Sequence, residues 1–308
     1  MAVLLCTHNG SRFLAEQLQS LRTQTRAAAI VLVHDWGSTD DTLAIVERFA
    51  GLESGGMQWH VTRHAGAPGA CRSFLTALCD TIDRVSGFDY LLFCDQDDVW
   101  HPQKLEAFAE AVRNRNSPAE LLYCDVAVVD AVGRVLARSY LGKGGAFGRP
   151  MHNAHRSTLF VNTVSGMSMA VSRGFLVRHR QAWEMPEWLM HDWAVCIVAH
   201  LASARVEFIA RSLVNYRQHD ANLVGGQGAL QARRTIAATL ARARRHVVQV
   251  HRQYEACATR LPPHLARQLE PCVGRWSVAG TMLAGRSLGL LRTFKVAVGY
   301  LLLWPRSN

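Results

Sequence analysis

The most informative chemical feature of the sequence is the acidic segment Asp95-Gln96-Asp97-Asp98, which follows the apolar run 90–94. In an extended segment, side chains two residues apart point to the same side, so Asp95 and Asp97 can converge on one cation. Mg²⁺ and Mn²⁺ prefer oxygen ligands and often bridge one or two protein carboxylates to substrate phosphates. The segment therefore predicts a divalent metal site that holds a diphosphate. The alternative is a solvated acidic turn that caps the next helix.

Two shorter polar clusters also follow apolar runs. The segment Thr-His-Asn at 7–9 follows the run 3–6, and the pair His34-Asp35 follows the run 30–33. In open α/β sheets, ligands bind beyond the carboxyl ends of the strands. If all three apolar runs are neighbouring parallel strands, the three polar clusters form one site.

The elements that must position these clusters alternate along the chain. Short continuous apolar runs predict buried strands, and apolar residues at helical spacing predict helices between them. This alternation favours an α/β fold with a mainly parallel sheet flanked by helices. We expect strands at 3–6, 30–33, 59–62, 90–94, 121–125, 165–171, 206–209 and 213–216, and helices at 11–24, 40–50, 72–85, 102–114 and 188–202.

With these elements in place, the sequence resembles glycosyltransferase family 2, whose members are inverting enzymes with the GT-A fold. The similarity extends over roughly the first 225 residues, and it implies a GT-A domain over 1–225. The strings CDQDDVW, HDW and YRQH are most similar to a rhamnosyltransferase-like subgroup. Six stretches in family order carry the resemblance: LLCTHNG at 4–10, HDWGSTDDT at 34–42, FCDQDDVWHPQKLE at 93–106, GMSMAVSR at 166–173, MHDWAVCIVA at 190–199 and YRQHDANLVG at 216–225.

The resemblance implies roles for individual residues. Asp192 stands where the family places the catalytic base that takes the proton of the acceptor hydroxyl. Asp97 and His219 would hold the divalent cofactor, Mg²⁺ or Mn²⁺, and Asp95 is an additional candidate ligand. The implied donor-binding residues are Thr7, Asn9, Asp35, Asp95, Asp97 and Arg217.

The sequence departs from the family pattern at two places. Trp36 stands at the second Asp of the DDGS turn, and an indole donates but cannot accept a hydrogen bond, so we expect base recognition to differ there. His191 replaces Glu in the common Glu-Asp form of the base motif. Without the resemblance, His191-Asp192 would be interpreted as an N-cap pair at a helix start.

The C-terminal part of the chain is strongly basic. Residues 226–308 contain 13 Lys+Arg and 2 Asp+Glu, whereas the preceding residues contain 21 and 22. The uncharged runs near the end, such as 296–304, are shorter than the about 20 residues that a spanning helix needs. We therefore expect a helical extension over 226–308, broken at Pro262-Pro263, that lies on an anionic membrane surface. The alternative is an appendage that packs on the body or on a second subunit.

The remaining composition bears on the cellular compartment. The apolar run at the N-terminus ends before Thr7, so we expect no signal peptide, and the eight cysteines form no CxxC pair. Both features favour a cytoplasmic protein with reduced thiols, peripheral at the inner face of the cell membrane. No nucleic-acid partner is expected, because the basic extension lacks a nucleic-acid-binding motif.

The sequence as a whole predicts a hexosyl- or rhamnosyl-type glycosyltransferase. We expect a dTDP- or UDP-sugar as donor and a glycan or lipid-linked acceptor, in cell-surface polysaccharide or lipid-linked glycan synthesis. One alternative is a nucleotidyltransferase of related fold, which would usually show a Gly-rich, basic phosphate loop where Thr7 to Gly10 stand. The other is a non-catalytic protein that binds an anionic surface.

Overall fold

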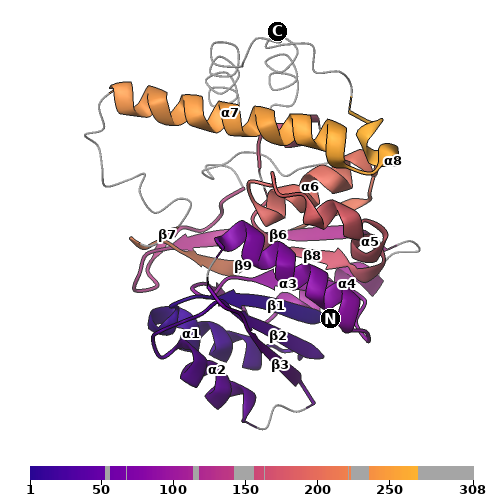
Figure 1. The fold of residues 1–308 in the computed structure, drawn as a ribbon. Coiled ribbons are helices and arrows are strands. Elements are labelled where there is room, and N and C mark those ends of the chain that lie inside the picture. Colours follow the sequence, from indigo (N-terminus) through magenta and orange to yellow (C-terminus); the bar gives the residue numbers. More distant parts are fainter. Residues whose placement is uncertain are drawn as a thin grey trace.

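The computed structural model shows one continuous sheet with helices on both faces (Figure 1). Within the described residues the sheet has nine strands, in the order β3-β2-β1-β4-β8-β6-β9-β5, with β7 paired to β6. The structure describes residues 1–52, 56–66, 68–113, 118–141, 156–162, 164–220, 222 and 236–269.

The first half of the sheet is parallel, as the sequence predicted. Strand β1 lies between β2 and β4, and β3 pairs with β2. The register places Thr7 beside Asp35, so the polar residues that end these strands meet at one edge of the sheet. The strands are β1 (Ala2–Thr7), β2 (Ile30–Asp35), β3 (Gln58–Arg63) and β4 (Tyr90–Cys94), and the helices between and after them are α1 (Ser11–Arg22), α2 (Thr42–Ala50), α3 (Ala70–Arg84) and α4 (Lys104–Arg113).

Alternation along the strands divides the core into two layers. On β1, Val3 and Leu5 face the layer that contains α1, α2 and α4, whereas Leu4 and Cys6 face the layer that contains α3 and α6 (His191–Leu201). A slip of one residue would exchange these faces, so burial on both sides fixes the register. Each fully buried Leu contributes about 1.5–3 kcal/mol. The fixed register holds the strand ends, and the polar residues beyond them, in one place.

The second half of the sheet differs from the prediction. The expected strand 165–171 is a 3₁₀ turn, Gly166–Ser168, followed by the short strand β8 (Met169–Ser172), which is antiparallel to β4 and β6. The Ser168 N–H donates to the Ser165 carbonyl at 3.0 Å and closes the turn. The expected strands 206–209 and 213–216 are one strand, β9 (Val206–Arg217), because register shifts against β6 (Leu121–Val129) accommodate the residues between them. The sheet is therefore mixed.

Smaller elements complete this half of the molecule. β5 pairs antiparallel with β9, and β7 pairs antiparallel with β6. Their bounds are β5 (Val99–Trp100), β7 (Val135–Ala137), α5 (Arg173–Arg178) and the 3₁₀ helices η1 (Arg156–Leu159) and η3 (Arg180–Glu184).

The described part of the C-terminal extension is helical and packs on the body. α7 (Ile236–Arg260) ends before Pro262-Pro263, as predicted, and α8 (Pro263–Ala266) follows. Figure 1 shows α7 lying across one end of the molecule beside α6. Val250 belongs to the same core as α6, and the Gln253 amide oxygen accepts from the Leu189 N–H at 2.9 Å. Residues 223–235 and 270–308 lie outside the described residues, so a boundary at 225 stays a prediction.

Two further findings concern the cysteines and the helices. The seven cysteines among the described residues are all free thiols. In the described parts of the chain, no helix has both the length and the apolar character that crossing a bilayer requires.

Candidate active site

The ends of β1 and β2 are joined by a buried hydrogen-bond network around Asp35. The Thr7 hydroxyl donates to Asp35 Oδ1 at 3.0 Å. The Ser38 N–H donates to Asp35 Oδ2 at 3.0 Å, and the Ser38 hydroxyl donates to Oδ1 at 2.5 Å. Asp35 is only 1% exposed, so these donors fix its carboxylate in one orientation.

Asn9 connects the same two loops. Its φ of +47° lies in the left-handed region, which Asn tolerates better than most residues. The Asn9 N–H donates to the Ser38 hydroxyl at 2.9 Å, and Asn9 Oδ1 accepts from the Thr39 N–H at 2.8 Å. The structure therefore brings Thr7, Asn9 and Asp35 together, at the edge of the sheet where the sequence placed them.

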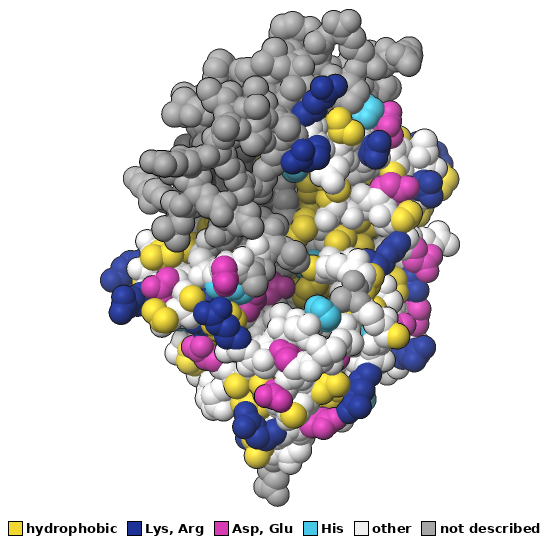
Figure 2. All heavy atoms as spheres, turned by 60° about the vertical axis from the view of Figure 1, so that its left-hand side comes forward, with side chains coloured by type: hydrophobic (Ala, Val, Ile, Leu, Met, Phe, Trp, Pro, Cys, Tyr) yellow, Lys and Arg dark blue, Asp and Glu magenta, His cyan; other side chains and the backbone are white. Residues whose placement is uncertain are grey.

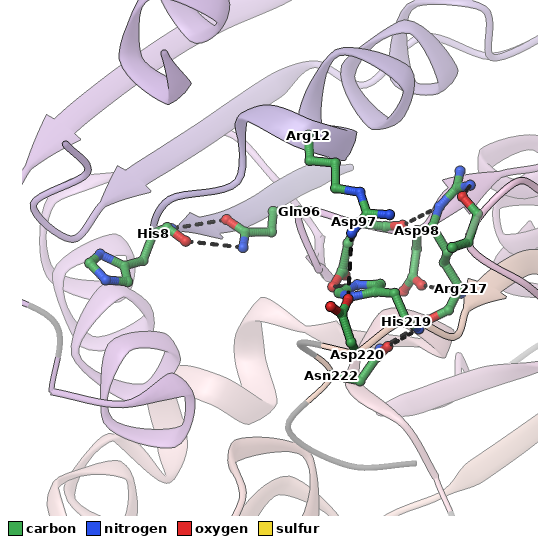
Figure 3. A network of polar contacts seen from close by, with 10 residues as sticks. His8, Arg12, Gln96, Asp97, Asp98, Arg217, His219, Asp220 and Asn222 are labelled. Carbon is green, nitrogen blue, oxygen red and sulfur yellow. Dashed lines mark hydrogen bonds and ion pairs between the residues drawn. The ribbon is translucent and has the colours of Figure 1, made fainter. Parts of the chain in front are cut away.

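Gln96 ties the acidic segment to the first loop, a role that the sequence analysis missed. The His8 N–H donates to Gln96 Oε1 at 2.9 Å, and Gln96 Nε2 donates to the His8 carbonyl at 3.1 Å (Figure 3). A Cβ at Gly10 would overlap the Gln96 amide, so a larger residue there would displace the side chain that makes these two hydrogen bonds. The position of Gln96 between Asp95 and Asp97 could have drawn attention to it. The sequence pattern pointed only to the two Asp residues, as metal ligands.

Asp97 and His219 meet across the site although 122 residues separate them. His219 Nε2 lies 2.9 Å from Asp97 Oδ2, and the two side chains face each other in Figure 3. The side-chain exposure is 6% for His219 and 21% for Asp97. The structure thus forms the pair that the resemblance implied as metal ligands, while the ligand role itself stays a prediction.

The rest of the acidic segment concentrates negative charge beside this pair. Burial, together with the nearby charges of Asp97 and Asp192, raises the pKa of Asp95 to about 7, although Lys104 acts to lower it. Asp98 is 1% exposed, and its Oδ2 has no hydrogen-bond partner among the described residues. Burial, with Asp97 and Asp95, raises the pKa of Asp98 well above its usual value. Crowded carboxylates with an unpartnered buried oxygen fit a divalent cation, which would relieve their repulsion.

A buried lysine lies beneath the acidic segment, and the sequence analysis missed it. Lys104 is fully buried, its Nζ donates to the Met167 carbonyl at 2.6 Å, and it lies 3.2 Å from the centroid of the Trp100 ring. Burial lowers the pKa of Lys104 to about 8, whereas Asp98 and Asp95 act to raise it. The available signal was a charged residue on the helix face that otherwise buries Leu and Phe.

Arg217 supports the acidic segment from within the protein. It is 2% exposed, and its backbone N–H donates to Asp98 Oδ1 at 3.0 Å. Its guanidinium donates to the Asp97 carbonyl at 2.9 Å, to the Ala131 carbonyl at 3.1 Å and to Glu16 at 2.6 Å. In this structure the guanidinium holds the loop that bears Asp97 in place. Direct contact between Arg217 and a nucleotide-sugar donor stays a prediction.

Asp192 stands in the first turn of α6 and accepts three hydrogen bonds. The donors are Asn162 Nδ2 at 2.9 Å, the Gly166 N–H at 3.0 Å and the Trp193 N–H at 2.7 Å. Burial raises the pKa of Asp192 to about 6, and these donors oppose that shift. Asp192 is close enough to Asp95 for its charge to act there, so the implied base and the acidic segment share one site.

His191 acts through packing. Its ring stacks on Phe74 with centroids 4.1 Å apart, and neither ring nitrogen has a hydrogen-bond partner among the described residues. Burial lowers its pKa to about 3, so the ring is neutral near pH 7. A Cβ at Gly166 would lie 2.4 Å from His191 Nε2. The neutral ring therefore fills the space behind the backbone that orients Asp192.

Trp36, the departure from the family pattern, packs on a histidine. Its ring stacks on His64 with centroids 3.8 Å apart and planes 9° apart, and Trp36 is 6% exposed. The face of the molecule in Figure 2 has an indentation near its middle, bordered by acidic and hydrophobic side chains.

The chain was compared with known proteins. The model of glycosyl transferase family 2 matches residues 2–155. The dTDP-rhamnosyl transferase RfbG of Shigella flexneri is 24% identical over 236 residues, which cover 74% of this chain and 76% of that protein.

Two solved structures share the fold. S. aureus TarS 1–349 in complex with UDP has a TM-score of 0.56 at 17% identity, covering 96% of this chain and 74% of TarS. The mannosyltransferase PcManGT from Pyrobaculum calidifontis, in complex with GDP-Man and Mn²⁺, has a TM-score of 0.53 at 17% identity, covering 98% of this chain and 73% of PcManGT. The GT-A fold expected from the sequence is confirmed.

The close approach of Gly166 to His191 gives a first prediction. Gly166→Ala forces the 3₁₀ turn or the imidazole to move, and either displacement disturbs the N–H that Asp192 accepts. We expect turnover to fall by about 10- to 100-fold and stability by about 1–3 kcal/mol. The matched control is Gly174→Ala on the exposed face of α5, where an added Cβ meets nothing within 4 Å. Urea unfolding and steady-state kinetics measure both; equal turnover in the two variants contradicts the positioning role.

Proposed function

The chain belongs to glycosyltransferase family 2, whose members use nucleotide-sugar donors, and we propose that it transfers a sugar to an acceptor hydroxyl with inversion at the anomeric carbon. One observation carries this proposal. The acidic segment, its histidine partner and a buried carboxylate at a helix start lie together beyond the carboxyl ends of parallel strands. The family match favours this reaction over nucleotidyl transfer, the earlier alternative.

We propose that the nucleoside of the donor lies against the network of Thr7, Asn9 and Asp35. Asp35 is held in one orientation by buried donors, so it is prepared to contact a ribose or base without reordering. A dTDP- or UDP-linked sugar is the proposed donor. RfbG is named a dTDP-rhamnosyl transferase, and TarS was solved with UDP.

We propose that Asp97 and His219, with Asp95, hold Mg²⁺ or Mn²⁺. The cation would neutralise charge on the departing diphosphate, a kind of electrostatic stabilisation that is usually large. The crowding of the three carboxylates supports this assignment, as does the Mn²⁺ in the PcManGT structure. Arg217 keeps the loop that bears Asp97 in position through its contact with the Asp97 carbonyl.

We propose Asp192 as the general base. Its pKa, raised to about 6 by burial, leaves it ionised at neutral pH and a stronger base than an exposed Asp. Three donors orient the carboxylate, so it can receive the acceptor proton as the hydroxyl attacks from the face opposite the diphosphate.

The metal assignment predicts the effect of Asp97→Asn. We expect turnover of nucleotide sugars to fall at least about 100-fold with little loss of fold, because a ligand charge is removed from the proposed cation site. The measurement is a screen of dTDP- and UDP-sugars for turnover, with Mg²⁺, Mn²⁺ or a chelator, alongside thermal unfolding. Asp89→Asn, an exposed carboxylate just before the start of β4, is the matched control. Full turnover by folded Asp97→Asn would refute the metal assignment.

The base assignment predicts a pH profile. Because the ionised form of Asp192 is active, turnover should rise with pH through about 6 and then level. The contribution of Asp192 to the free energy of unfolding changes with pH in the opposite direction to turnover. The folded pKa lies above the unfolded value of about 4, so this contribution is present below pH about 4 and is lost as pH rises through about 6.

Asp192→Asn should keep donor affinity, lose turnover and lose both pH effects. Calorimetry with the donor is the control for a preserved site. Near-native turnover in the folded variant would mean that another group is the base.

For the acceptor, we propose a glycan or lipid-linked hydroxyl at the cytoplasmic face of a membrane, in cell-surface polysaccharide or lipid-linked glycan synthesis. The basic balance of residues 226–308 supports this, and Arg244 and Arg245 on α7 are exposed. The packing of α7 on the body is compatible with a surface role for its outer face.

The membrane proposal predicts salt-sensitive binding to phosphatidylglycerol vesicles and little binding to phosphatidylcholine vesicles. Each basic residue near an anionic surface contributes about 1 kcal/mol, so Arg244→Glu with Arg245→Glu should weaken binding strongly without changing donor affinity. The control is Arg26→Glu with Arg205→Glu, two exposed positions on the body with the same change of charge. Sedimentation with vesicles measures this. Equal binding by both double variants would contradict a role for α7.

A further inference from the structure

A second group of potential metal ligands lies next to the hydrogen-bond network of Thr7, Asn9 and Asp35, called here the donor network because it is the proposed binding site of the nucleotide sugar. His34 is near the end of β2, His64 follows β3 directly, and Asp80 is on α3. One ligand atom from each of these residues lies within 4.8 Å of the other two. His34 is 4% exposed, and His64 and Asp80 are partly buried. Among the described residues, these three side chains are the group of His, Cys, Asp or Glu residues close enough to share one cation.

The two imidazoles already point the right atoms at each other. His34 Nδ1 and His64 Nε2 are 2.9 Å apart. In a tetrahedral site with metal–nitrogen bonds of about 2.0–2.1 Å, ligand atoms are about 3.3 Å apart. A cation could therefore lie between the two nitrogens if they separated by about 0.4 Å and the Asp80 carboxylate moved into bonding distance.

The protonation chemistry of such an exchange balances. A neutral imidazole carries one proton, on either ring nitrogen. Without a cation, either His34 Nδ1 or His64 Nε2 carries the proton between the two rings. With a cation bound, His34 would carry its proton on Nε2 and His64 on Nδ1. One ring therefore changes tautomer, and neither ring releases a proton. Burial lowers the pKa of His34 to about 4 and also lowers the pKa of His64, so both rings are neutral near pH 7.

We propose that His34, His64 and Asp80 form a second cation site, selective for Zn²⁺ over Mg²⁺. Two imidazole nitrogens and one carboxylate oxygen suit Zn²⁺, Co²⁺ or Ni²⁺, whereas Mg²⁺ requires mainly oxygen ligands. The acidic segment with Asp97 has the oxygen-rich composition that suits Mg²⁺ or Mn²⁺. The two sites therefore differ in chemistry and are occupied independently.

The surroundings of the cluster show what a cation there would do. Trp36 stacks on His64, and His34 directly precedes Asp35, the centre of the donor network. The charged groups that act on the two rings are Asp80, Asp35 and Arg84. A bound cation would join the end of β2 to the loop after β3 and to α3. It would stabilise the fold behind the donor network without contacting the donor.

The test uses the full-length, untagged protein after treatment with a chelator, in excess Mg²⁺ and without a nucleotide sugar. Thermal unfolding is followed as Zn²⁺ is added, and Co²⁺ is titrated by visible absorption. We expect one equivalent of Zn²⁺ to raise the Tm by about 5 °C, and Co²⁺ to give the intense absorption of a tetrahedral site. Excess Mg²⁺ competes with Zn²⁺ at the oxygen-rich site, and the Asp97→Asn variant separates any response of that site from the response of the cluster.

Variants assign the response to the cluster. His64→Gln and Asp80→Asn should each abolish the rise in Tm caused by Zn²⁺. If one of the two variants does not fold, the other still tests the proposal. His60→Gln, an exposed histidine on β3, and Asp97→Asn should keep it. The proposal is overturned if Zn²⁺ leaves the wild-type Tm unchanged, or if it stabilises His64→Gln and Asp80→Asn as much as the wild type. Because no donor is present, neither result depends on the proposed transferase reaction.

Discussion

The constraint on which the site depends is the crowding of three carboxylates at the end of a central strand, with Asp98 buried and Asp95 and Asp97 partly buried. Removing carboxylates from water is costly unless partners compensate. The protein supplies the nearby charge of the buried Lys104, a backbone N–H of Arg217 that donates to Asp98, and the His219 imidazole beside Asp97. Lys104 begins the helix that follows the acidic segment, whereas Arg217 and His219 lie at the end of β9, 119 and 122 residues away from Asp98 and Asp97. The end of β9 therefore has to pack against the acidic segment for these contacts to form.

The parallel half of the sheet makes this concentration of charge useful. Its register places the donor network around Asp35 beside the acidic segment, and Gln96 joins the two through both hydrogen bonds to His8. A nucleoside diphosphate has an uncharged end and an anionic end. The edge of the sheet offers a hydrogen-bonded surface around Asp35 next to the acidic segment, and this order would suit the two ends of the proposed donor.

Local pattern predicted much of this arrangement, and the failures have physical causes. Continuous apolar runs are local, so the four parallel strands and the acidic strand end could be found from the sequence. The turn at Gly166 could not, because contact with His191 decides it. Lys104 was missed because a lysine on an apolar face becomes interpretable only when its carboxylate partners are known. The pairing of Asp97 with His219 spans 122 residues and followed only from the resemblance.

The raised pKa values of Asp95 and Asp192 would link binding of the proposed cation to ionisation of the proposed base. Burial raises the pKa of both carboxyls, and the charges of Asp97 and Asp192 raise the pKa of Asp95 as well. A cation on the acidic segment would favour ionised Asp95 and weaken the repulsion between the two carboxylates. By linkage, ionised Asp192 then favours the cation as much as the cation favours ionised Asp192. If Asp97 and Asp95 hold the proposed cation and Asp192 is the base, cation binding would therefore favour the ionised base through the charge interaction between Asp95 and Asp192.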